Sequence, residues 1–390
     1  MREGWKYKKL GDVCAPKKEI KRASKAFSPN DEIAYIDISS IDNSSQKMTG
    51  CTNYVLSDAP SRAQQCVQNG DIIVSTVRPN LKNIAIVDSC DTNLVASSGF
   101  CVLRPSNIER QYLFYYITSE KFTNHLIGLT TGANYPAVRD SDILGSMIPV
   151  PPISVQNSIV SELDKINELI RLKKEQLNDY DKLAQSIFYE MFGDPVENCM
   201  GWEVKHIGDF GTCIAGATPS TTVEEYWTGG TIPWLSSGEV SKGRIFNTDK
   251  RITQHGYDSC STRMIPAHTI VIAMAGQGKT RGTVGVAEIP LCTNQSICSI
   301  VTNENIDVDF LYYQIKYLYN ELRSASNGDG GRGGLNLRLI QKFPIISPNY
   351  SLQGSFAKRI KTVELLKSNI QSTIQDLETL LASRMQYWFD

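Results

Sequence analysis

The chain repeats itself at about half its length, and this repeat constrains the fold more than any other feature of the sequence. The stretch GWKYKKLGD at Gly4–Asp12 returns as GWEVKHIGD at Gly201–Asp209, and YLFYYI at Tyr112–Ile117 returns as FLYYQI at Phe310–Ile315. The period is far longer than the roughly 20 to 50 residues of solenoid repeats. The sequence therefore predicts two copies of one globular architecture within the 390 residues.

Each copy ends in a long segment whose apolar residues recur every three or four positions. The first segment starts this pattern at Ile159, Leu163 and Ile166, and the second starts it at Phe356 and Ile360. A sustained spacing of about 3.5 residues is typical of a coiled-coil seam. A helix of almost 40 residues is about 55–60 Å long. Two equivalent halves favour an antiparallel pair of helices within the chain, acting as a spacer; the alternative is a coil between separate chains.

The globular segments have the pattern of a mixed α/β fold, because apolar runs of strand length alternate with glycine-rich and asparagine-rich loops. We expect a helix at Gln111–Thr118 in the first copy and at Val308–Leu318 in the second. The expected strands are Glu32–Ser40, Gly70–Val77, Asn83–Val87, Gly99–Leu103, Thr269–Met274, Thr283–Glu288 and Ile297–Val301. The predicted fold class is α/β, with two similar domains joined by two long helices that form an antiparallel, pseudo-twofold coiled coil.

The charge balance gives the chain no general affinity for a polyanion. Lys and Arg total 40 against 41 Asp and Glu, so the net charge is −1. A nucleic-acid partner would have to meet local patches, or share phosphate neutralisation with another subunit. Basic residues are concentrated early, between Lys6 and Lys25. No apolar run approaches the roughly 18 residues of a membrane span and no apolar signal segment is evident, so we expect no membrane contact and a cytoplasmic location.

The sequence offers little catalytic chemistry. The ten cysteines include no Cys-x-x-Cys pair, so we expect neither a metal site nor a redox site. The segment Ala273–Thr280 resembles a phosphate-binding loop, but β-rich, glycine-broken sequence follows it where such a loop needs a helix. A basic, polar loop that contacts DNA explains it better. No catalytic residue is predicted, and the chain is not expected to be an enzyme.

These residues resemble the specificity (S) subunits of type I restriction-modification systems over essentially the whole chain. The most specific stretch is YWTGGTIPWLSSGEVSKGRI at Tyr226–Ile245, followed by Arg251-Ile252-Thr253, IVIAMAGQGKTRG and Thr293-Asn294-Gln295. The entry Ile148–Pro152, with Gln156 and then a heptad helix, resembles the spacer region of that family. The second entry is less regular, with Pro344 and Pro348 split apart.

The resemblance implies two target-recognition domains that each read one half of a bipartite DNA sequence. The corresponding division is target-recognition domain 1 at 1–152, spacer helix 1 at 153–193, target-recognition domain 2 at 194–350 and spacer helix 2 at 351–390. It implies two methyltransferase (M) subunits and, in the complete enzyme, restriction (R) subunits as partners on double-stranded DNA. S-adenosylmethionine, ATP and Mg would belong to those partners, with no cofactor in this chain.

Candidate DNA contacts were chosen by residue type within the loops, because Arg and Lys suit guanine or phosphate and Asn and Gln suit adenine. They are Arg78, Asn80, Lys82, Asn134 and Tyr135 in the first half and Gln277, Lys279, Arg281, Arg332 and Arg338 in the second.

Two other functions remain open, namely a coiled-coil scaffold that does not bind DNA and a P-loop-like nucleotide-binding protein. A specificity subunit of a fused cut-and-modify enzyme also fits the sequence.

Overall fold

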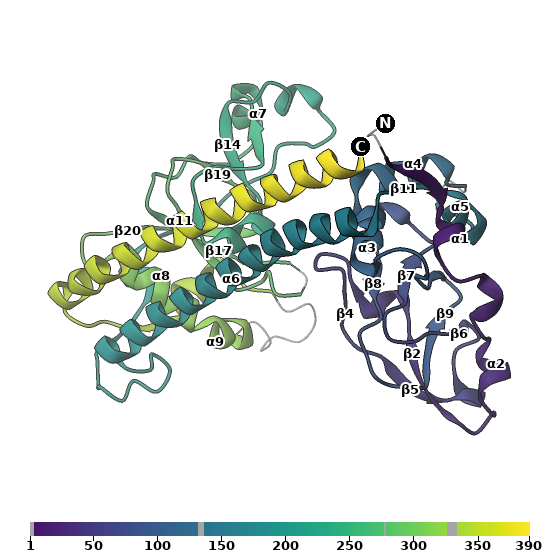
Figure 1. The fold of residues 1–390 in the computed structure, drawn as a ribbon. Helices are drawn as coiled ribbons and strands as arrows, with labels where there is room; N and C mark the ends of the chain where they lie inside the picture. The colour runs from purple at the N-terminus through teal and green to yellow at the C-terminus, as the bar shows by residue number, and fades with distance from the viewer. Residues whose placement is uncertain (1–3, 132–135, 277, 326–333) are drawn as a thin grey trace. The chain divides into compact units, whose positions relative to one another are not determined.

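The computed structural model describes residues 4–131, 136–276, 278–325 and 334–390 (Figure 1). It consists of two compact units, each of which combines a sheet-rich domain with parts of two long helices. Unit 1 is Met1–Lys174 with Ser372–Asp390, and unit 2 is Glu175–Gln371. Helix α6 (Ile153–Phe192) and helix α11 (Tyr350–Phe389) each run from one unit into the other. The predicted mixed α/β class, with two sheet-rich domains connected by long helices, is confirmed.

Unit 1 is built from short sheets and the helices that cover them. The strand orders are β1(Lys6–Lys9)-β11(Met147–Val150), β10(Phe100–Leu103)-β7(Ile72–Ser75)-β8(Ile84–Ile86), β5(Thr52–Val55)-β2(Glu32–Ile36)-β9(Leu94–Ser97)-β6(Ala63–Cys66) and β3(Ile41–Asp42)-β4(Lys47–Met48). Its shorter helices are α1 (Leu10–Val13), α2 (Ala23–Ala26), α3 (Arg110–Thr118), α4 (Glu120–Leu129) and α5 (Asp140–Gly145).

Unit 2 repeats this plan with a larger central sheet. The strand orders are β12(Val204–His206)-β21(Pro344–Ile346), β13(Gly211–Ala215)-β20(Ile297–Thr302)-β17(Thr269–Ala273)-β18(Val284–Ala287)-β15(Arg244–Ile245) and β16(Lys250–Ile252)-β14(Ile232–Leu235)-β19(Cys292–Thr293). Its shorter helices are α7 (Gln254–Asp258), α8 (Val308–Tyr317), α9 (Tyr319–Ser324) and α10 (Leu337–Gln341). The predicted segments Gly70–Val77 and Thr269–Met274 correspond to the central strands β7, which is two residues shorter at each end, and β17, which ends one residue earlier.

The two central strands have apolar side chains on both faces. In β7, Ile72 and Val74 join the core beneath the helices while Ile73 joins the core against the second sheet. In β17, Ile270 and Ile272 face one core while Val271 and Ala273 face the other. Successive side chains of a strand point to opposite faces, so a strand covered on both sides needs a continuous apolar run. This explains why IIVS and TIVIA lack the polar alternation of a surface strand.

The long helices lie antiparallel in both units. In unit 1, Glu162 of α6 pairs with Arg384 of α11, and Lys174 pairs with Glu378 at 2.8 Å. In unit 2, Asp181 of α6 pairs with Lys367 at 3.0 Å. Partner numbers fall along α11 as they rise along α6, which is the order that antiparallel helices require. The predicted antiparallel pairing within one chain is therefore confirmed.

Each unit completes its core with the end of a helix that begins in the other unit. Phe389, near the end of α11, is 1% exposed and packs against Tyr112 and Tyr116 in unit 1, with ring centroids 5.4 and 5.7 Å apart. Phe188 and Phe192, near the end of α6, are fully buried in the core of unit 2. Neither half of the sequence therefore contains all the residues that close its own core.

A buried glutamine holds the start of each long helix in the same way. The Oε1 atoms of Gln156 and Gln353 each accept a hydrogen bond, 2.9 Å long, from the backbone N–H of the residue that caps α3 or α8, Glu109 or Asp307. Each Nε2 donates to a proline carbonyl five positions earlier, at 2.8 Å. The amides satisfy backbone groups that would otherwise be buried without partners. The repeated arrangement shows that both copies of the architecture dock their helix alike.

Unit 2 also contains an ionic cluster that ties the sheet to α11. The guanidinium group of Arg244, whose side chain is 19% exposed, contacts three carboxylates, those of Glu288, Asp309 and Glu364. Burial alone would raise the pKa of Glu364. The hydrogen bond from the Tyr313 hydroxyl and the charges of Lys367 and Arg244 outweigh burial and hold this pKa below its usual value. The cluster thus joins β15, the residue that follows β18, α8 and α11 through charge.

The packing of Phe389 gives a first prediction. Phe389→Ala should lower the free energy of unfolding of unit 1 by about 3–5 kcal/mol, because it removes a buried aromatic ring and leaves a cavity. Hydrogen exchange should show α3 and α4 losing protection while β17 and β20 keep theirs. Phe246→Ala, at a side chain that is 65% exposed, is the control. Unchanged protection of α3 in the Phe389 variant would contradict this account of the core.

The ionic cluster gives a second prediction. Arg244→Leu should lower the free energy of unfolding of unit 2 by about 3–5 kcal/mol at pH 7, because charged carboxylates stay buried without their counter-ion. A depressed pKa makes Glu364 stabilising above its unfolded pKa of about 4.3, and this contribution disappears as the pH falls through the lower folded value. The effect of the substitution should therefore shrink below about pH 5.

Urea unfolding at pH 7 and in mild acid measures this difference, with the exposed Arg263→Leu as the control. An equal loss at both pH values would show that the charge of Glu364 is not involved.

Candidate nucleic-acid interface

In unit 1, candidate DNA contacts lie on the turn between β7 and β8. Arg78 and Asn80 are exposed and Lys82 is half-buried. Arg78 and Lys82 both have φ near +50°, on the two sides of the short turn Pro79–Leu81. Such left-handed backbone is costly for residues other than glycine and persists only where the surrounding structure maintains it. The turn therefore presents its side chains in a defined shape.

This turn is joined to a second segment, which precedes α5. The backbone N–H of Arg78 donates to the carbonyl of Pro136 at 2.8 Å, and that of Val138 donates to Thr76 at 2.9 Å. Ala137 forms isolated β-bridges with both Val77 and Thr131. The structure thus brings the turn that carries Arg78 next to the base of the predicted 134–135 loop. Asn134 and Tyr135 themselves lie outside the described residues.

In unit 2, the equivalent connection between β17 and β18 carries Lys279, which is exposed, and Arg281, which is half-buried. Gly276 has φ +142°, and a Cβ atom there would lie 2.7 Å from the Thr280 side chain. Gly282 has φ +88°, and its Cβ would lie 3.0 Å from Cγ of Arg323. A close approach and a positive φ together require glycine at both positions. Gln277 lies outside the described residues.

Two residues of α9 donate hydrogen bonds to backbone carbonyls of this loop. Arg323 Nη1 donates to the carbonyl of Gly278 at 2.8 Å and to that of Arg281 at 3.2 Å. The Tyr319 hydroxyl donates to the carbonyl of Lys279 at 2.8 Å and also accepts from Arg323 at 2.7 Å. These contacts involve the backbone of the loop, and the side chain of Lys279 remains exposed. Sequence reasoning missed both residues, since they lie about 40 positions further along the chain and carry no motif.

Arg338 comes next to the start of the same loop. It is exposed and lines a hollow of about 490 Å³ together with Met274, Ala275 and Gln295. The backbone N–H of Leu335 donates to the carbonyl of Met274 at 3.2 Å. The structure therefore brings Arg338 close to the loop that carries Lys279, as it brings the segment after 135 close to Arg78. Arg332 lies outside the described residues.

The described residues of these loops offer hydrogen-bonding side chains, and the features of a catalytic or phosphate-binding loop are not found among them. The connection from β17 to β18 has no helix among its described residues, so the resemblance of Ala273–Thr280 to a phosphate-binding loop lacks the helix N-terminus that such a site needs. Burial, with the nearby charge of Asp71, raises the pKa of Cys14 to about 12, and burial raises that of Cys292 to about 11. These thiols stay protonated near neutral pH and are poor nucleophiles. Arg, Lys and amide side chains instead offer hydrogen bonds to base edges and phosphates.

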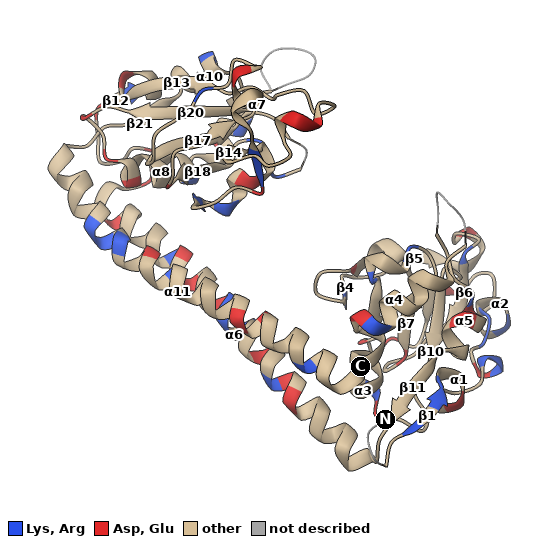
Figure 2. Cartoon of the chain, turned by 90° about the horizontal axis from the view of Figure 1, so that it is seen from above, with Lys and Arg blue, Asp and Glu red and all other residues tan. Residues whose placement is uncertain are grey.

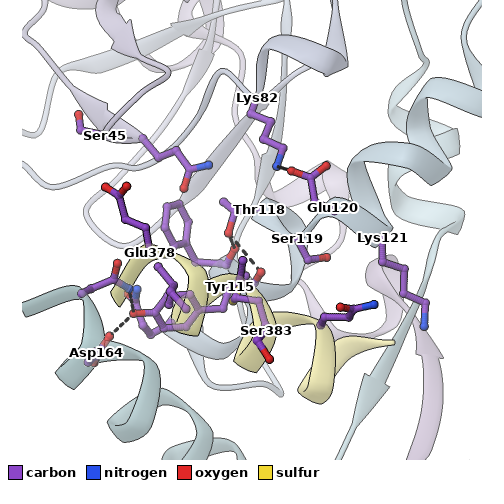
Figure 3. A pocket seen from close by; sticks show the side chains of 18 of the residues that line it. Ser45, Lys82, Tyr115, Thr118, Ser119, Glu120, Lys121, Asp164, Glu378 and Ser383 are labelled. Atoms are coloured by element: carbon purple, nitrogen blue, oxygen red, sulfur yellow. Dashed lines mark hydrogen bonds and ion pairs between the residues drawn. The ribbon is translucent and has the colours of Figure 1, made fainter. Parts of the chain in front are cut away.

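Lys82 faces a larger hollow of unit 1, about 1550 Å³ in volume (Figure 3). Its ammonium group pairs with Glu120 at 2.6 Å. The Tyr115 hydroxyl donates to Asp164 at 2.5 Å and accepts from Asn167 at 2.9 Å. Carboxylates outnumber cationic groups in this lining, which also includes apolar side chains of α3 and α11. The hollow therefore does not favour a polyanion, and Lys82 is already engaged by a carboxylate.

Among the described residues, no helix is long and apolar enough to cross a membrane. Within the same ranges, no group of three or more His, Cys, Asp or Glu side chains is arranged to hold a metal ion.

Two tandem matches to one family model are found in the sequence. The model, described as the type I restriction modification DNA specificity domain, matches residues 2–179 and 200–379. The type I restriction enzyme HindI specificity subunit of Haemophilus influenzae is 21% identical, covering 98% of both chains. The EcoR124I/EcoR124II specificity subunit of Escherichia coli is 25% identical over 62% of this chain and 60% of its own.

Solved structures agree with these matches. A chain from a structure concerned with complex assembly and conformational transition of the type I R-M system aligns with a TM-score of 0.60 and 26% identity, covering 99% of this chain and 97% of that chain. The S subunit of a type I restriction-modification system from M. genitalium aligns with a TM-score of 0.54 and 16% identity, over 99% of this chain and 96% of its own. The second likeness concerns the fold alone.

The support of the Lys279 loop by α9 gives a third prediction. Arg323→Ala should speed hydrogen exchange of the 278–283 amides about tenfold or more, because it removes two backbone hydrogen bonds and frees the loop. Tyr319→Phe should have a smaller effect, since it removes one. Arg263→Ala is the control, at an exposed arginine of the same unit. Equal exchange in all variants would mean that the loop keeps its shape without α9.

Proposed function

The chain belongs to the type I restriction modification DNA specificity family, and we propose that it selects the DNA sequence on which a type I restriction-modification complex acts. Its relatives are specificity subunits, which are non-catalytic components of such complexes. The chain is accordingly not an enzyme. Its work is binding, and its specificity depends on the loops of the two units.

The proposal rests on one observation: the two units share the same arrangement of strands and helices but differ in the loops that this arrangement supports. Each unit has a buried central strand followed by a connection that is joined to the segment before the last short strand. The connection in unit 1, residues 76–83, contains the short turn Pro79–Leu81, whereas that in unit 2, residues 274–283, contains Gly276 and Gly282, where the backbone requires glycine. The same frame with unequal loops suits two half-sites of different sequence. We therefore propose a bipartite, asymmetric DNA target.

The base contacts follow from side-chain chemistry. Arg78, Asn80, Asn134 and Tyr135 are proposed for the first half-site, and Gln277, Lys279, Arg281, Arg332 and Arg338 for the second. Lys82 is proposed as a phosphate contact. To bind a DNA phosphate, its ammonium group must first break the ion pair with Glu120.

Partner subunits supply the chemistry in this proposal. Two methyltransferase subunits would bind S-adenosylmethionine and flip the target adenine, and restriction subunits would use ATP and Mg. The antiparallel halves of α6 and α11 would set the spacing between the half-sites, as protein geometry sets half-site spacing in other DNA readers. The complex would act in the cytoplasm.

Co-expression with a partner methyltransferase, followed by single-molecule sequencing of genomic DNA, tests the function directly. A split motif with a constant gap, lost when this chain is omitted, is the expected result. No methylation that depends on the chain, with the methyltransferase folded and bound, would reject the proposal. A scaffold without DNA affinity would then account better for the molecule.

Single substitutions separate the two half-sites. Arg78→Ala should relax only the first half-site and Lys279→Ala only the second, because a good base contact contributes about 1–3 kcal/mol of discrimination. The exposed Arg263→Ala serves as the control and should leave both half-sites unchanged. A variant whose methylated motif is identical to that of the unaltered chain removes its residue from the set of base contacts.

A further inference from the structure

A basic hollow lies in unit 1, apart from the base-reading turn. It has a volume of about 430 Å³ and is formed by the segment around α2 against the ends of β6 and β9. Figure 2 shows Lys and Arg, in blue, on the ribbon around α2. The charged residues that line it are Lys17, Lys18, Lys21, Arg22, Lys25 and Asp140.

The hollow carries a large uncompensated positive charge. Asp140, its one carboxylate, pairs with Lys17. Among the described residues, the charged groups of Lys18, Lys21, Arg22 and Lys25 form no ion pair with a carboxylate. Cations gathered in a concave surface repel one another and attract an anion. This contrasts with the hollow around Tyr115, where carboxylates outnumber cations.

The backbone of this basic segment is anchored to the sheet. The backbone N–H of Cys66 in β6 donates to the carbonyl of Lys21 at 2.9 Å, and Arg22 forms an isolated β-bridge with Gln65. Ala23, at the start of α2, is 1% exposed. The cations therefore project from a positioned segment, which lowers the entropy lost when they bind a ligand. Neutral donors at Gln64 and Ser98 line the same hollow.

The hollow is close to the base of the predicted reading loop of unit 1. Asp140 in its lining is three residues after Ala137, which bridges Val77 and Thr131. Three residues of extended chain span at most about 11 Å. Each strand of DNA carries one phosphate per ~3.4 Å of helix axis, so a backbone held at this loop passes within a few phosphates of the hollow.

The second half of the chain has no counterpart to this charge. The positions that correspond to 17–25 through the repeat read IAGATPSTT, at Ile214–Thr222, and contain no Lys or Arg. The basic hollow is thus a feature that distinguishes unit 1 from unit 2. It was visible in the sequence only as a concentration of Lys and Arg before position 25.

We propose that this hollow binds backbone phosphates of the DNA that flanks the first half-site, through Lys18, Lys21, Arg22 and Lys25. The proposal rests on the proposed function and adds a second kind of contact to it. These side chains strengthen binding without reading sequence, because phosphates are the same for every base pair. Their contribution depends on salt, since each neutralised phosphate releases counter-ions.

The test uses the complex of the full chain with its methyltransferase partners. Kobs for DNA containing the methylated motif is measured against salt concentration for the unaltered chain and for a variant with Lys18, Lys21, Arg22 and Lys25 each changed to Gln. The slope of log Kobs against log salt should fall by about 2–4, as expected for roughly 0.9 per phosphate contact. The methylated motif should stay the same in both half-sites.

A matched variant controls for net charge. It changes four other exposed lysines to Gln, namely Lys165, Lys342, Lys358 and Lys361. A slope that falls as much in this control as in the hollow variant would overturn the proposal, because general attraction would then explain the effect. Thermal unfolding confirms that the variants fold, as expected for exposed positions.

Other outcomes are equally informative. An unchanged slope in the hollow variant overturns the proposal, and so does a changed motif, which would mean that these residues read bases. Saturable binding of pyrophosphate at constant ionic strength, seen without DNA and lost in the hollow variant, would assign the hollow to a free phosphate ligand instead. Absence of any motif in the unaltered complex would reject the proposed function, whereas a normal motif with an unchanged slope rejects only the phosphate site.

Discussion

Phe389 and the pair Phe188 and Phe192 close the cores of two units from helices that begin elsewhere, and the rest of the structure depends on this exchange. A sheet-rich domain of about 150 residues leaves one apolar face open, and in each unit the halves of α6 and α11 cover it. Because α6 begins in unit 1 and ends in unit 2, whereas α11 begins in unit 2 and ends in unit 1, the two helices run antiparallel. The buried amides of Gln156 and Gln353 then set where each helix starts. Burial of apolar side chains stabilises the packing of the helices on each core, and the buried amides fix the position at which each helix begins.

The two units differ in the polar contacts that surround this frame. In unit 2, the Arg244 cluster ties the sheet to α11 through charge, and α9 supports a long loop. In unit 1, the surface along α3 and α11 stays hollow, and a bidentate pair between Arg104 and the buried Asp71 braces the edge of the sheet instead, with both hydrogen bonds at 2.8 Å. Duplication has therefore preserved the packing that makes the fold and altered the polar contacts around it.

The sequence was sufficient for the architecture because the signals that specify it are local. The heptad spacing from Ile159 and the apolar runs of β7 and β17 each involve neighbouring residues, and the repeat shows that the same local patterns occur in both halves. The sequence was insufficient wherever a contact joins distant segments. Nothing near Arg244 indicates that it meets Glu364, and nothing near Lys279 points to Arg323. The same limit applies to the site. Residue type and loop position were enough to select Arg78 and Lys279 as candidate contacts. The ion pair between Lys82 and Glu120, and the hollow that Lys21 and Arg22 line, are visible only in the structure.

The exchanged helix ends have a consequence for synthesis on the ribosome. Domains usually fold in the order in which they are made, the N-terminal one first. Here the residues of unit 2, Glu175–Gln371, are all translated before Phe389, which unit 1 needs to close its core. The unit that begins the chain is therefore the last to be completed. From the time that α3 and β11 have been made until Phe389 emerges, its apolar face lacks part of its cover, so the nascent chain is open to chaperones, or to pairing with a second nascent chain, while the later unit is being made.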